Sequence, residues 1–439
     1  MKQEHLTTTK FSNLELSNVI VKGLKEAGFI HCTPIQDRCL PISLRDKDIA
    51  GQAQTGTGKT AAFLLATFQR LLNDKNKENK NPRALILAPT RELAIQIHKD
   101  AKLLSAYLDL NFALIYGGTD YKKQLNSLKG DVDIIIGTTG RIIDFYKQKA
   151  LSLDNIQVMV IDEADRMFDL GFIKDIRFIL RRMPPAETRL NMLFSATLSY
   201  KVTELAYEHM NNPVIVKIET EEVTSKAIQQ TAYCPSNEQK IPLLIGLLQQ
   251  LKPVRSIIFV NTKRCGELLN RYLQGNDYRV ALLSGDVPQD KRQRLLNDFQ
   301  EDRVNLMIAT DVAARGLHIP DVSHVFNYDL PQDVEDYVHR IGRTARFGAS
   351  GVAISFICEE YAYSMPDIED YIGEKVPVSA ITSDILAQDL KPPVAEKRRE
   401  YRKQPGKKPA QARRKKPRPT KPPVAATSIE NPQSKETTE

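Results

Sequence analysis

The 439-residue chain has few cysteines and no long apolar run. Five cysteines without a C-x-x-C pair predict neither a disulfide framework nor a zinc site. No apolar run approaches the ~18 residues needed to cross a bilayer, and the polar start at residues 1–5 is unlike a signal peptide. We therefore expect a cytosolic protein of two or three domains, each large enough to bury a core.

Excess charge is also absent from most of the chain. The net charge of +8 is concentrated in residues 391–439, which hold 15 Lys and Arg against 5 Asp and Glu, so the remainder has 47 basic and 49 acidic side chains. Nine of the 24 prolines lie there too, which predicts a disordered basic tail. The tail is either a solvated end or an arm that binds polyanions, and the run 413–416 favours the second.

The stretch 53–60 predicts a phosphate-binding loop, although it begins with Ala where the usual pattern has Gly. Its glycines let the backbone curl so that amides point inward at an anion. Lys59 can reach the terminal phosphates, and the Thr60 hydroxyl can hold Mg²⁺. The alternative is a glycine-rich turn with an incidental lysine, but the apolar run 61–66 predicts the helix that such a loop opens. The predicted nucleotide-binding residues of the loop are Ala53, Gln54, Thr55, Gly56, Thr57, Gly58, Lys59 and Thr60.

Two residues upstream of the loop are candidates for holding the base. Thr33 and Pro34 predict a helix start, and Gln36 in its first turn offers a donor and an acceptor that can read an adenine edge. Phe29 can stack on the base. For Phe29 the alternative is simple core packing.

Unbroken apolar runs alternate with helical stretches along the first half of the chain, as expected for buried parallel strands. A polar signature follows each run, where open α/β sheets place their ligands. The runs are 84–88, 132–136, 158–161 and 192–194.

The pattern repeats after residues 218–226, a polar stretch that predicts a linker. The second half has no second Gly-Lys-Thr, so it cannot cradle phosphates by itself and is expected to act against the first. We predict an α/β protein with two tandem parallel-sheet domains at 1–217 and 227–377, the linker between them, and the tail at 391–439.

Asp162 and Glu163 follow the apolar run 158–161. Asp162 suits Mg²⁺ ligation, and Glu163 can orient and deprotonate an attacking water. The transferred phosphoryl group also needs positive charge beyond Lys59. Arg343 and Arg346 are three residues apart, so on a helix they share one face, and they can act as arginine fingers. Hydrolysis would then require the two domains to close.

The order of these stretches resembles the DEAD-box RNA helicases over roughly residues 11–376. The matching segments are Gln36, 53–60, 89–93, 117–118, 162–165, 195–197, Gln289 with Arg292, 309–316 and 339–346. The resemblance implies two RecA-like domains, ATP and Mg²⁺ as cofactors, RNA as the partner, and local unwinding driven by ATP hydrolysis.

The resemblance also implies roles for individual residues. It gives adenine recognition to Phe29 and Gln36, magnesium to Thr60 and Asp162, and the general base to Glu163, and it lets Ser195 and Thr197 link hydrolysis to strand separation. The RNA-facing residues that it implies are Pro89, Thr90, Arg91, Gly118, Thr138, Gly140 and Arg141 in the first domain, with Arg292, Thr310 and Gly316 in the second.

Three positions depart from the family pattern: Thr139 replaces the usual Pro, Ala345 a common Gly, and His318 an Asp that usually contacts the ribose. The segments 137–141 and 316–320 resemble a bacterial branch that works in the RNA degradosome. That branch implies an RNase E-type endoribonuclease as partner, docked on the second domain.

Two rival functions are also compatible with the phosphate-binding loop. An ATP-gated RNA clamp with little unwinding would share all of these motifs, so a short-duplex unwinding assay separates it from a helicase. A P-loop transporter or DNA-translocating ATPase is disfavoured by the motifs of the second half.

Overall fold

The computed structural model describes residues 6–54, 56–74, 81–218, 227–314, 322–345 and 350–395, and no side chains at 289 and 290. Several sequence predictions therefore lie outside the described residues: Thr55, Gly316, His318, Arg346, most of the linker, and the tail from 396 onward. None of the described helices is long and apolar enough to cross a membrane.

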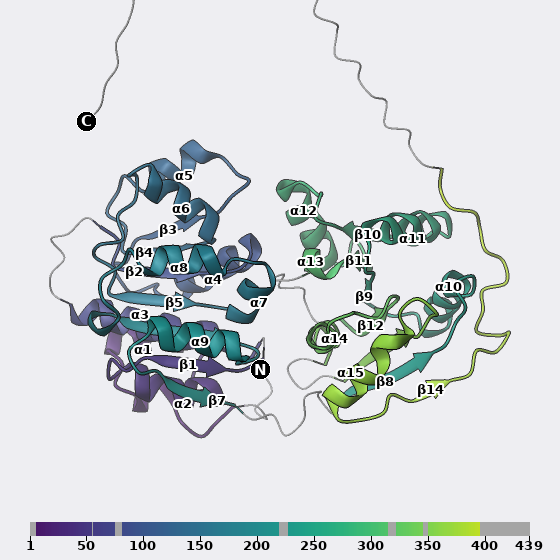
Figure 1. Cartoon of the computed structure of the whole chain (residues 1–439), viewed down its shortest axis with the longest axis horizontal. Coiled ribbons are helices and arrows are strands. Elements are labelled where there is room, and N and C mark those ends of the chain that lie inside the picture. The colour runs from purple at the N-terminus through teal and green to yellow at the C-terminus, as the bar shows by residue number, and fades with distance from the viewer. Residues whose placement is uncertain are drawn as a thin grey trace, which may run out of the picture. The chain divides into compact units, whose positions relative to one another are not determined.

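The first domain holds one seven-stranded parallel sheet in the order β3-β4-β2-β5-β6-β1-β7 (Figure 1). Its strands are β1 (Ile49–Gln52), β2 (Ala84–Leu87), β3 (Phe112–Ile115), β4 (Ile134–Gly137), β5 (Val158–Ile161), β6 (Leu190–Ser195) and β7 (Val214–Lys217). Its helices are η2 (Phe11–Asn13), α1 (Asn18–Glu26), α2 (Pro34–Ser43), α3 (Lys59–Asn73), α4 (Arg91–Leu104), α5 (Tyr121–Ser127), α6 (Thr139–Lys147), α7 (Ala164–Asp169), α8 (Ile173–Leu180), η3 (Ala186–Thr188) and α9 (Tyr200–His209).

The second domain repeats this plan with the order β10-β11-β9-β12-β13-β8-β14, again all parallel. Its strands are β8 (Ile228–Tyr233), β9 (Ser256–Phe259), β10 (Val280–Leu283), β11 (Leu306–Ala309), β12 (His324–Asn327), β13 (Gly351–Phe356) and β14 (Val378–Ser379). Its helices are α10 (Lys240–Leu251), α11 (Lys263–Gly275), α12 (Gln289–Gln300), α13 (Asp311–Ala314), α14 (Val334–Ile341), η4 (Ala362–Ser364) and α15 (Met365–Ile372).

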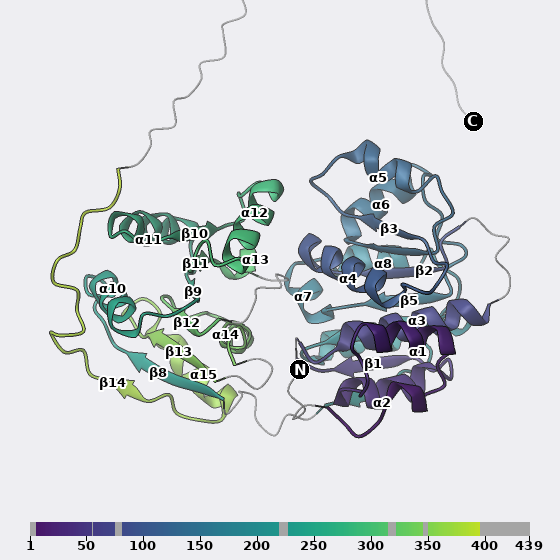
Figure 2. The same ribbon diagram turned by 180° about the vertical axis from the view of Figure 1, so that it is seen from behind.

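Each sheet is covered on both faces, which explains why its central strands read as unbroken apolar runs. In the first domain α1 to α4 pack on one face and α5 to α9 on the other, and they enclose two separate apolar cores. Figure 1 shows α8 and α9 in front of this sheet. Figure 2, which is seen from behind, shows α1 in front of the opposite face. In the second domain α10 and α11 cover one face, while α12 to α15 cover the other. The predicted α/β class with two tandem parallel sheets is confirmed.

Residues 380–395, here called the strap, continue the second domain beyond its last strand and lie over α10 and α11. Its apolar side chains are partly buried and pack against the apolar cluster to which α10 and α11 contribute. The strap passes close to two helix positions that have no side chain. A Cβ at Gly246 would lie 1.9 Å from the carbonyl oxygen of Ile385, and one at Gly275 would lie 2.5 Å from that of Pro392. Glycine at both positions therefore permits the contact.

Candidate functional site

The predicted site residues of the first domain gather at the carboxyl edge of its sheet. The predicted nucleotide segments follow β1, β5 and β6, which are neighbours in the sheet, and the predicted RNA segments follow β2, β3 and β4, which are neighbours beside them. This edge is where open α/β sheets bind ligands. The strand order thus separates the predicted nucleotide segments from the predicted RNA segments along this edge, and we call these two parts the nucleotide half and the RNA half.

The phosphate loop joins β1 to the N-terminus of α3. Gly56 and Gly58 have φ angles of 85° and 92°, in the left-handed region that favours glycine. The Lys59 side chain is buried, and its Nζ donates to the carbonyl oxygen of Ala53 at 2.7 Å, inside the curl of the loop. The loop amides and the start of α3 therefore form the anion-binding geometry that the sequence predicted.

Gln36 contacts the phosphate loop directly. Its Nε2 donates to the carbonyl oxygen of Gly58 at 3.0 Å, and its Oε1 accepts from the backbone N–H of Thr33 at 2.8 Å. A Cβ at position 58 would lie 2.4 Å from the same Nε2. The sequence predicted that Gln36 recognises adenine, and it did not predict this contact. The contact joins α2 to the phosphate loop. Phe29 is half-buried against the apolar core beside α1.

Asp162 and Glu163 form an acidic turn after β5. Burial raises the pKa of Asp162 to about 7, with Lys59 acting in the opposite direction and Glu163 adding to the rise. Burial likewise raises the pKa of Glu163. Glu163 has a φ of 50°, an uncommon left-handed conformation for a residue with a side chain, and such backbone strain clusters at functional sites.

A divalent cation fits this turn. Among the described residues no Lys, Arg or His side chain forms an ion pair with the buried Asp162 carboxylate, and two further carboxylates, of Glu163 and Asp165, raise its pKa. No cluster of three acidic, His or Cys side chains in the described part can hold a metal unaided. Asp162 with the Thr60 hydroxyl would therefore hold Mg²⁺ only together with phosphate oxygens.

Asp165 connects the acidic turn to the end of β6, a role that the motif spacing did not reveal. Its Oδ2 accepts from the backbone N–H groups of Ala196 and Thr197 at 2.9 and 3.1 Å. Its own N–H donates to the Ser195 Oγ at 3.1 Å. The Ser195 carbonyl in turn accepts from the N–H of Ala53 at 3.0 Å, so the acidic turn, residues 195–197 and the phosphate loop are linked by consecutive hydrogen bonds.

Replacing Asp165 by asparagine should uncouple these segments. The amide cannot keep both of the acceptor oxygens, and a lost hydrogen bond to a charged group costs about tenfold or more in an equilibrium. We expect duplex unwinding per ATP hydrolysed to fall about tenfold, measured in parallel ATPase and strand-displacement assays. Asp175→Asn on α8 is the control, and an unchanged ratio in Asp165→Asn would contradict the link.

The RNA half of the edge presents backbone and cationic groups. Thr90 caps α4 by accepting from the N–H of Leu93 at 3.3 Å, and the Arg91 guanidinium lies over Gly118, where a Cβ would be 2.1 Å from its Nη1. Gly118 has a φ of 79°. Pro89, next to Thr90 in the chain, is buried.

The remaining predicted RNA residues of this domain, Thr138, Gly140 and Arg141, lie at the start of α6. The Arg141 guanidinium is stacked over the rings of Tyr121 and Phe145.

In the second domain a buried polar network holds α14, the helix just before Arg343. Arg340 is 1% exposed and donates to both carboxylate oxygens of Asp311, at 2.7 and 2.6 Å. It also donates to the carbonyl oxygen of Asp329 and the side chain of Asn261. Asp329 in turn pairs with the buried Lys240 at 2.5 Å. Sequence reasoning did not assign these residues, because no spacing signals a network drawn from three strand ends and two helices.

Some predicted residues make contacts between the two sheet domains. The positive charge of Arg343, which is mostly buried, lowers the pKa of Glu163 against the effect of burial. Arg292 pairs with Glu92 of α4 at 3.3 Å and also donates to the carbonyl oxygen of Ser284. Thr310 follows β11 at the start of α13.

A further ion pair was not predicted from the sequence. Arg166 of α7 pairs with Asp336 of α14 at 2.8 Å.

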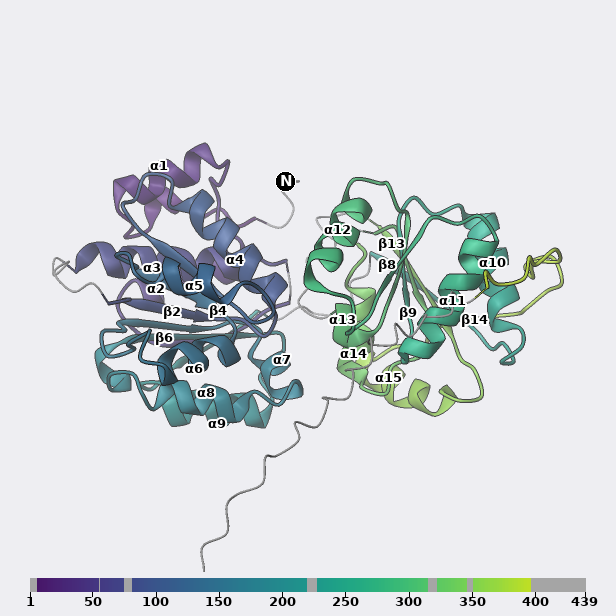
Figure 3. The same ribbon diagram turned by 90° about the horizontal axis from the view of Figure 1, so that it is seen from above.

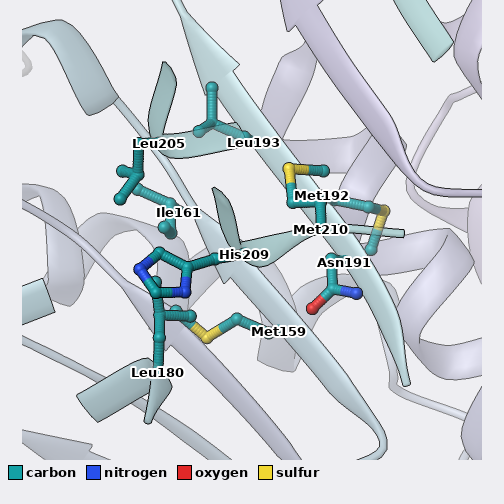
Figure 4. Close-up of a pocket in the computed structure, with 9 residues that line it drawn as sticks. All are labelled: Met159, Ile161, Leu180, Asn191, Met192, Leu193, Leu205, His209 and Met210. Atoms are coloured by element: carbon teal, nitrogen blue, oxygen red, sulfur yellow. The ribbon is translucent and has the colours of Figure 1, made fainter. Parts of the chain in front are cut away.

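Two cavities lie away from these residues. One, among β5, β6, α8 and α9, has a volume of about 10 Å³, enough for about one water molecule, so it is a packing defect of the core (Figure 4). The other, about 510 Å³, is an open hollow at the C-terminal end of α10, beside Tyr278 and Leu306. Neither cavity is lined by residues of the phosphate loop.

This fold and site define a P-loop protein with two tandem RecA-like domains. Its residues 33–205 match the DEAD/DEAH box helicase model, and residues 239–348 match the helicase conserved C-terminal domain. The chain is 58% identical over 397 residues to the ATP-dependent RNA helicase RhlB of Vibrio vulnificus, covering 90% of this chain and 91% of that protein. It is 58% identical over 396 residues to RhlB of Shewanella frigidimarina, with the same coverage.

Solved structures give the same result. The structure of S. cerevisiae Dbp5 bound to RNA and ADP BeF3 has a TM-score of 0.75 at 34% identity, covering 85% of this chain and 95% of that one. Mss116p bound to ssRNA and AMP-PNP has a TM-score of 0.77 at 28% identity, covering 87% and 81%. The chain belongs to the DEAD-box helicase family and is of the RhlB type.

Proposed function

We propose that this protein is an ATP-dependent RNA helicase, in which RNA binding stimulates ATP hydrolysis and hydrolysis drives the local separation of paired RNA. The observation that supports this most strongly is the strand order of the first sheet. In that order, the segments that we propose to bind nucleotide and the segments that we propose to bind RNA follow neighbouring strands at one edge. The RhlB relatives and the RNA-bound solved relatives support the same activity.

The residues of this site have separate tasks. The loop amides and Lys59 bind the phosphates, and Glu163 orients the attacking water and accepts its proton. Its raised pKa brings it closer to the working pH, where a general base is most effective. Arg343 supplies positive charge to the transferred phosphoryl group. Mg²⁺, held by Thr60, Asp162 and the phosphates, would neutralise charge on the phosphate oxygens.

The test measures ATPase rate with and without single-stranded RNA, and displacement of a short RNA strand under the same conditions. We expect RNA to raise the ATPase rate and ATP to drive displacement. RNA-stimulated ATPase without displacement would instead support an ATP-gated clamp, and equal stimulation by DNA would support a DNA-translocating ATPase.

We also propose that the protein works with an RNase E-type endoribonuclease in RNA degradation. The support is its likeness to RhlB over nine-tenths of both chains, together with the sequence segments 137–141 and 316–320. The full-length protein should be retained by an immobilised RNase E-type scaffold, and the scaffold should raise its RNA-stimulated ATPase. Absence of both effects would refute the partnership while leaving the helicase activity intact.

A further inference from the structure

The C-terminal ends of α6 and α8 form a cationic and aromatic surface outside the site described above. We call it the Arg182 platform, and it consists of Tyr146, Lys147, Phe178 and Arg182. The rings of Tyr146 and Phe178 meet edge to face with centroids 6.1 Å apart. The Arg182 guanidinium lies 3.4 Å from the Phe178 centroid and 5.7 Å from that of Tyr146, and Lys147 Nζ lies 5.4 Å from Phe178.

The guanidinium of Arg182 is held in place without a carboxylate. Its Nη1 donates to the carbonyl oxygen of Phe178 at 2.8 Å, which orients the cation over the ring. Among the described residues no acidic side chain pairs with Arg182 or Lys147, whereas the neighbouring Arg177 and Arg181 both pair with Glu208. Capping of α8 accounts for one N–H of Arg182. It does not account for the rings and the lysine gathered around it.

Such a cluster has the chemistry of a single-stranded nucleic-acid site. An arginine already stacked on one ring can accept a nucleobase on its other face, and a lysine beside it can contact a phosphate. All four platform residues are half-buried or exposed, so they are accessible from water. Lys149, exposed just beyond α6, adds a further positive charge.

The platform is continuous with the RNA half of the sheet edge. The proposed RNA residues Thr138, Gly140 and Arg141 lie at the N-terminal end of α6, and Tyr146 and Lys147 end the same helix. Figure 3 shows α6 and α8 on the same face of the first sheet, and the two helices are in contact. Between the two ends Asp144 faces Arg141 and Gln148. The nine residues of α6 span about 13 Å, the length of about four stacked nucleotides.

We propose that the Arg182 platform binds the single-stranded flank of the RNA as it leaves the sheet edge, with one base stacked on Arg182 and a phosphate at Lys147. This site rests on the proposed RNA-helicase function. It would add an RNA contact about four nucleotides beyond the RNA half of the sheet edge. RNAs with a longer unpaired flank would therefore bind more tightly than RNAs with a shorter one. A base stacked in this way contributes about tenfold in affinity.

The test compares RNAs of different length on the full-length protein. The shortest oligouridylate that fully stimulates the ATPase is extended by four or six nucleotides at either its 5′ or its 3′ end. The readout is the ratio of RNA concentrations for half-maximal ATPase, short over extended. In the wild type we expect a ratio of about ten for extension at one end and about one for the other.

Arg182→Ala should reduce this ratio to about one, and Arg182→Lys should recover only part of it, because lysine keeps the charge without the planar stack. Arg181→Ala, one residue away and paired with Glu208, is the control and should keep the wild-type ratio. Lys147→Glu reverses the charge of an exposed side chain, and it should also lower the ratio.

A wild-type ratio of one for both ends would overturn the platform, as would an undiminished ratio in both Arg182→Ala and Lys147→Glu. If the platform variants instead lose capture by an RNase E-type scaffold and keep the length ratio, the surface binds protein and the proposal is wrong. Failure of oligouridylates of every length to stimulate the ATPase would refute the helicase function itself, a result distinct from either of these.

Discussion

Glu163→Gln abolishes ATP turnover while ATP and RNA still bind: this is the expected result with the largest effect. The glutamine keeps the shape of the side chain and one acceptor oxygen, but it cannot take a proton from the attacking water. Loss of a general base lowers turnover by about 10²–10⁴-fold. Single-turnover ATPase, together with fluorescent-nucleotide and RNA titrations, measures the rate and the two affinities separately.

Position 163 also has a backbone reason to be tested by a substitution of equal size. With φ at 50°, a change of residue size or branching would add strain to any chemical effect. Glu187→Gln, on the exposed η3 turn, is the matched control and should leave turnover unchanged. Loss of ATP binding in Glu163→Gln would contradict the role of general base.

Arg343→Ala should lower kcat by roughly a thousandfold with a modest loss of ATP affinity, the behaviour of an arginine finger. The physical reason is that, among the described side chains, Lys59 and Arg343 are the two cations whose charge most strongly lowers the pKa of Glu163. Steady-state ATPase at saturating RNA gives kcat, and nucleotide titration gives the affinity.

The control for Arg343 is Arg303→Ala, an exposed arginine of the same domain that pairs with Asp298 and Glu301. Arg343→Lys should recover little activity, because a lysine cannot form the planar fork that arginine presents to a phosphoryl group. A near-normal kcat in Arg343→Ala would remove the finger from the mechanism.

Local sequence signals predicted the sheets and the phosphate loop. The apolar runs at 84–88 and 158–161 became the buried strands β2 and β5, because a strand covered on both faces leaves no polar position in its pattern. Gly56 and Gly58 sit in left-handed conformations, and glycine tolerates these better than other residues do.

Long-range polar contacts could not be predicted in this way. Asp165 meets residues 196 and 197, about thirty positions along the chain, and Arg340 meets Asp311 and Asn261 from different strand ends. These partners are fixed by strand order, and one sequence does not specify which strands become neighbours. The contact of Gln36 with Gly58 was missed for the same reason, since it depends on α2 packing beside the phosphate loop.

The strap changes what counts as the folding unit of this protein. Family motifs end well before residue 378, so a fragment designed on motifs alone would stop there and leave the outer faces of α10 and α11 in water. Apolar helix surface bared in this way promotes self-association. A fragment of the second domain that extends to Ala395 should therefore stay monodisperse at concentrations where one ending at 377 precipitates. By the same reasoning, Gly246 and Gly275 are intolerant positions although neither lies in a catalytic motif.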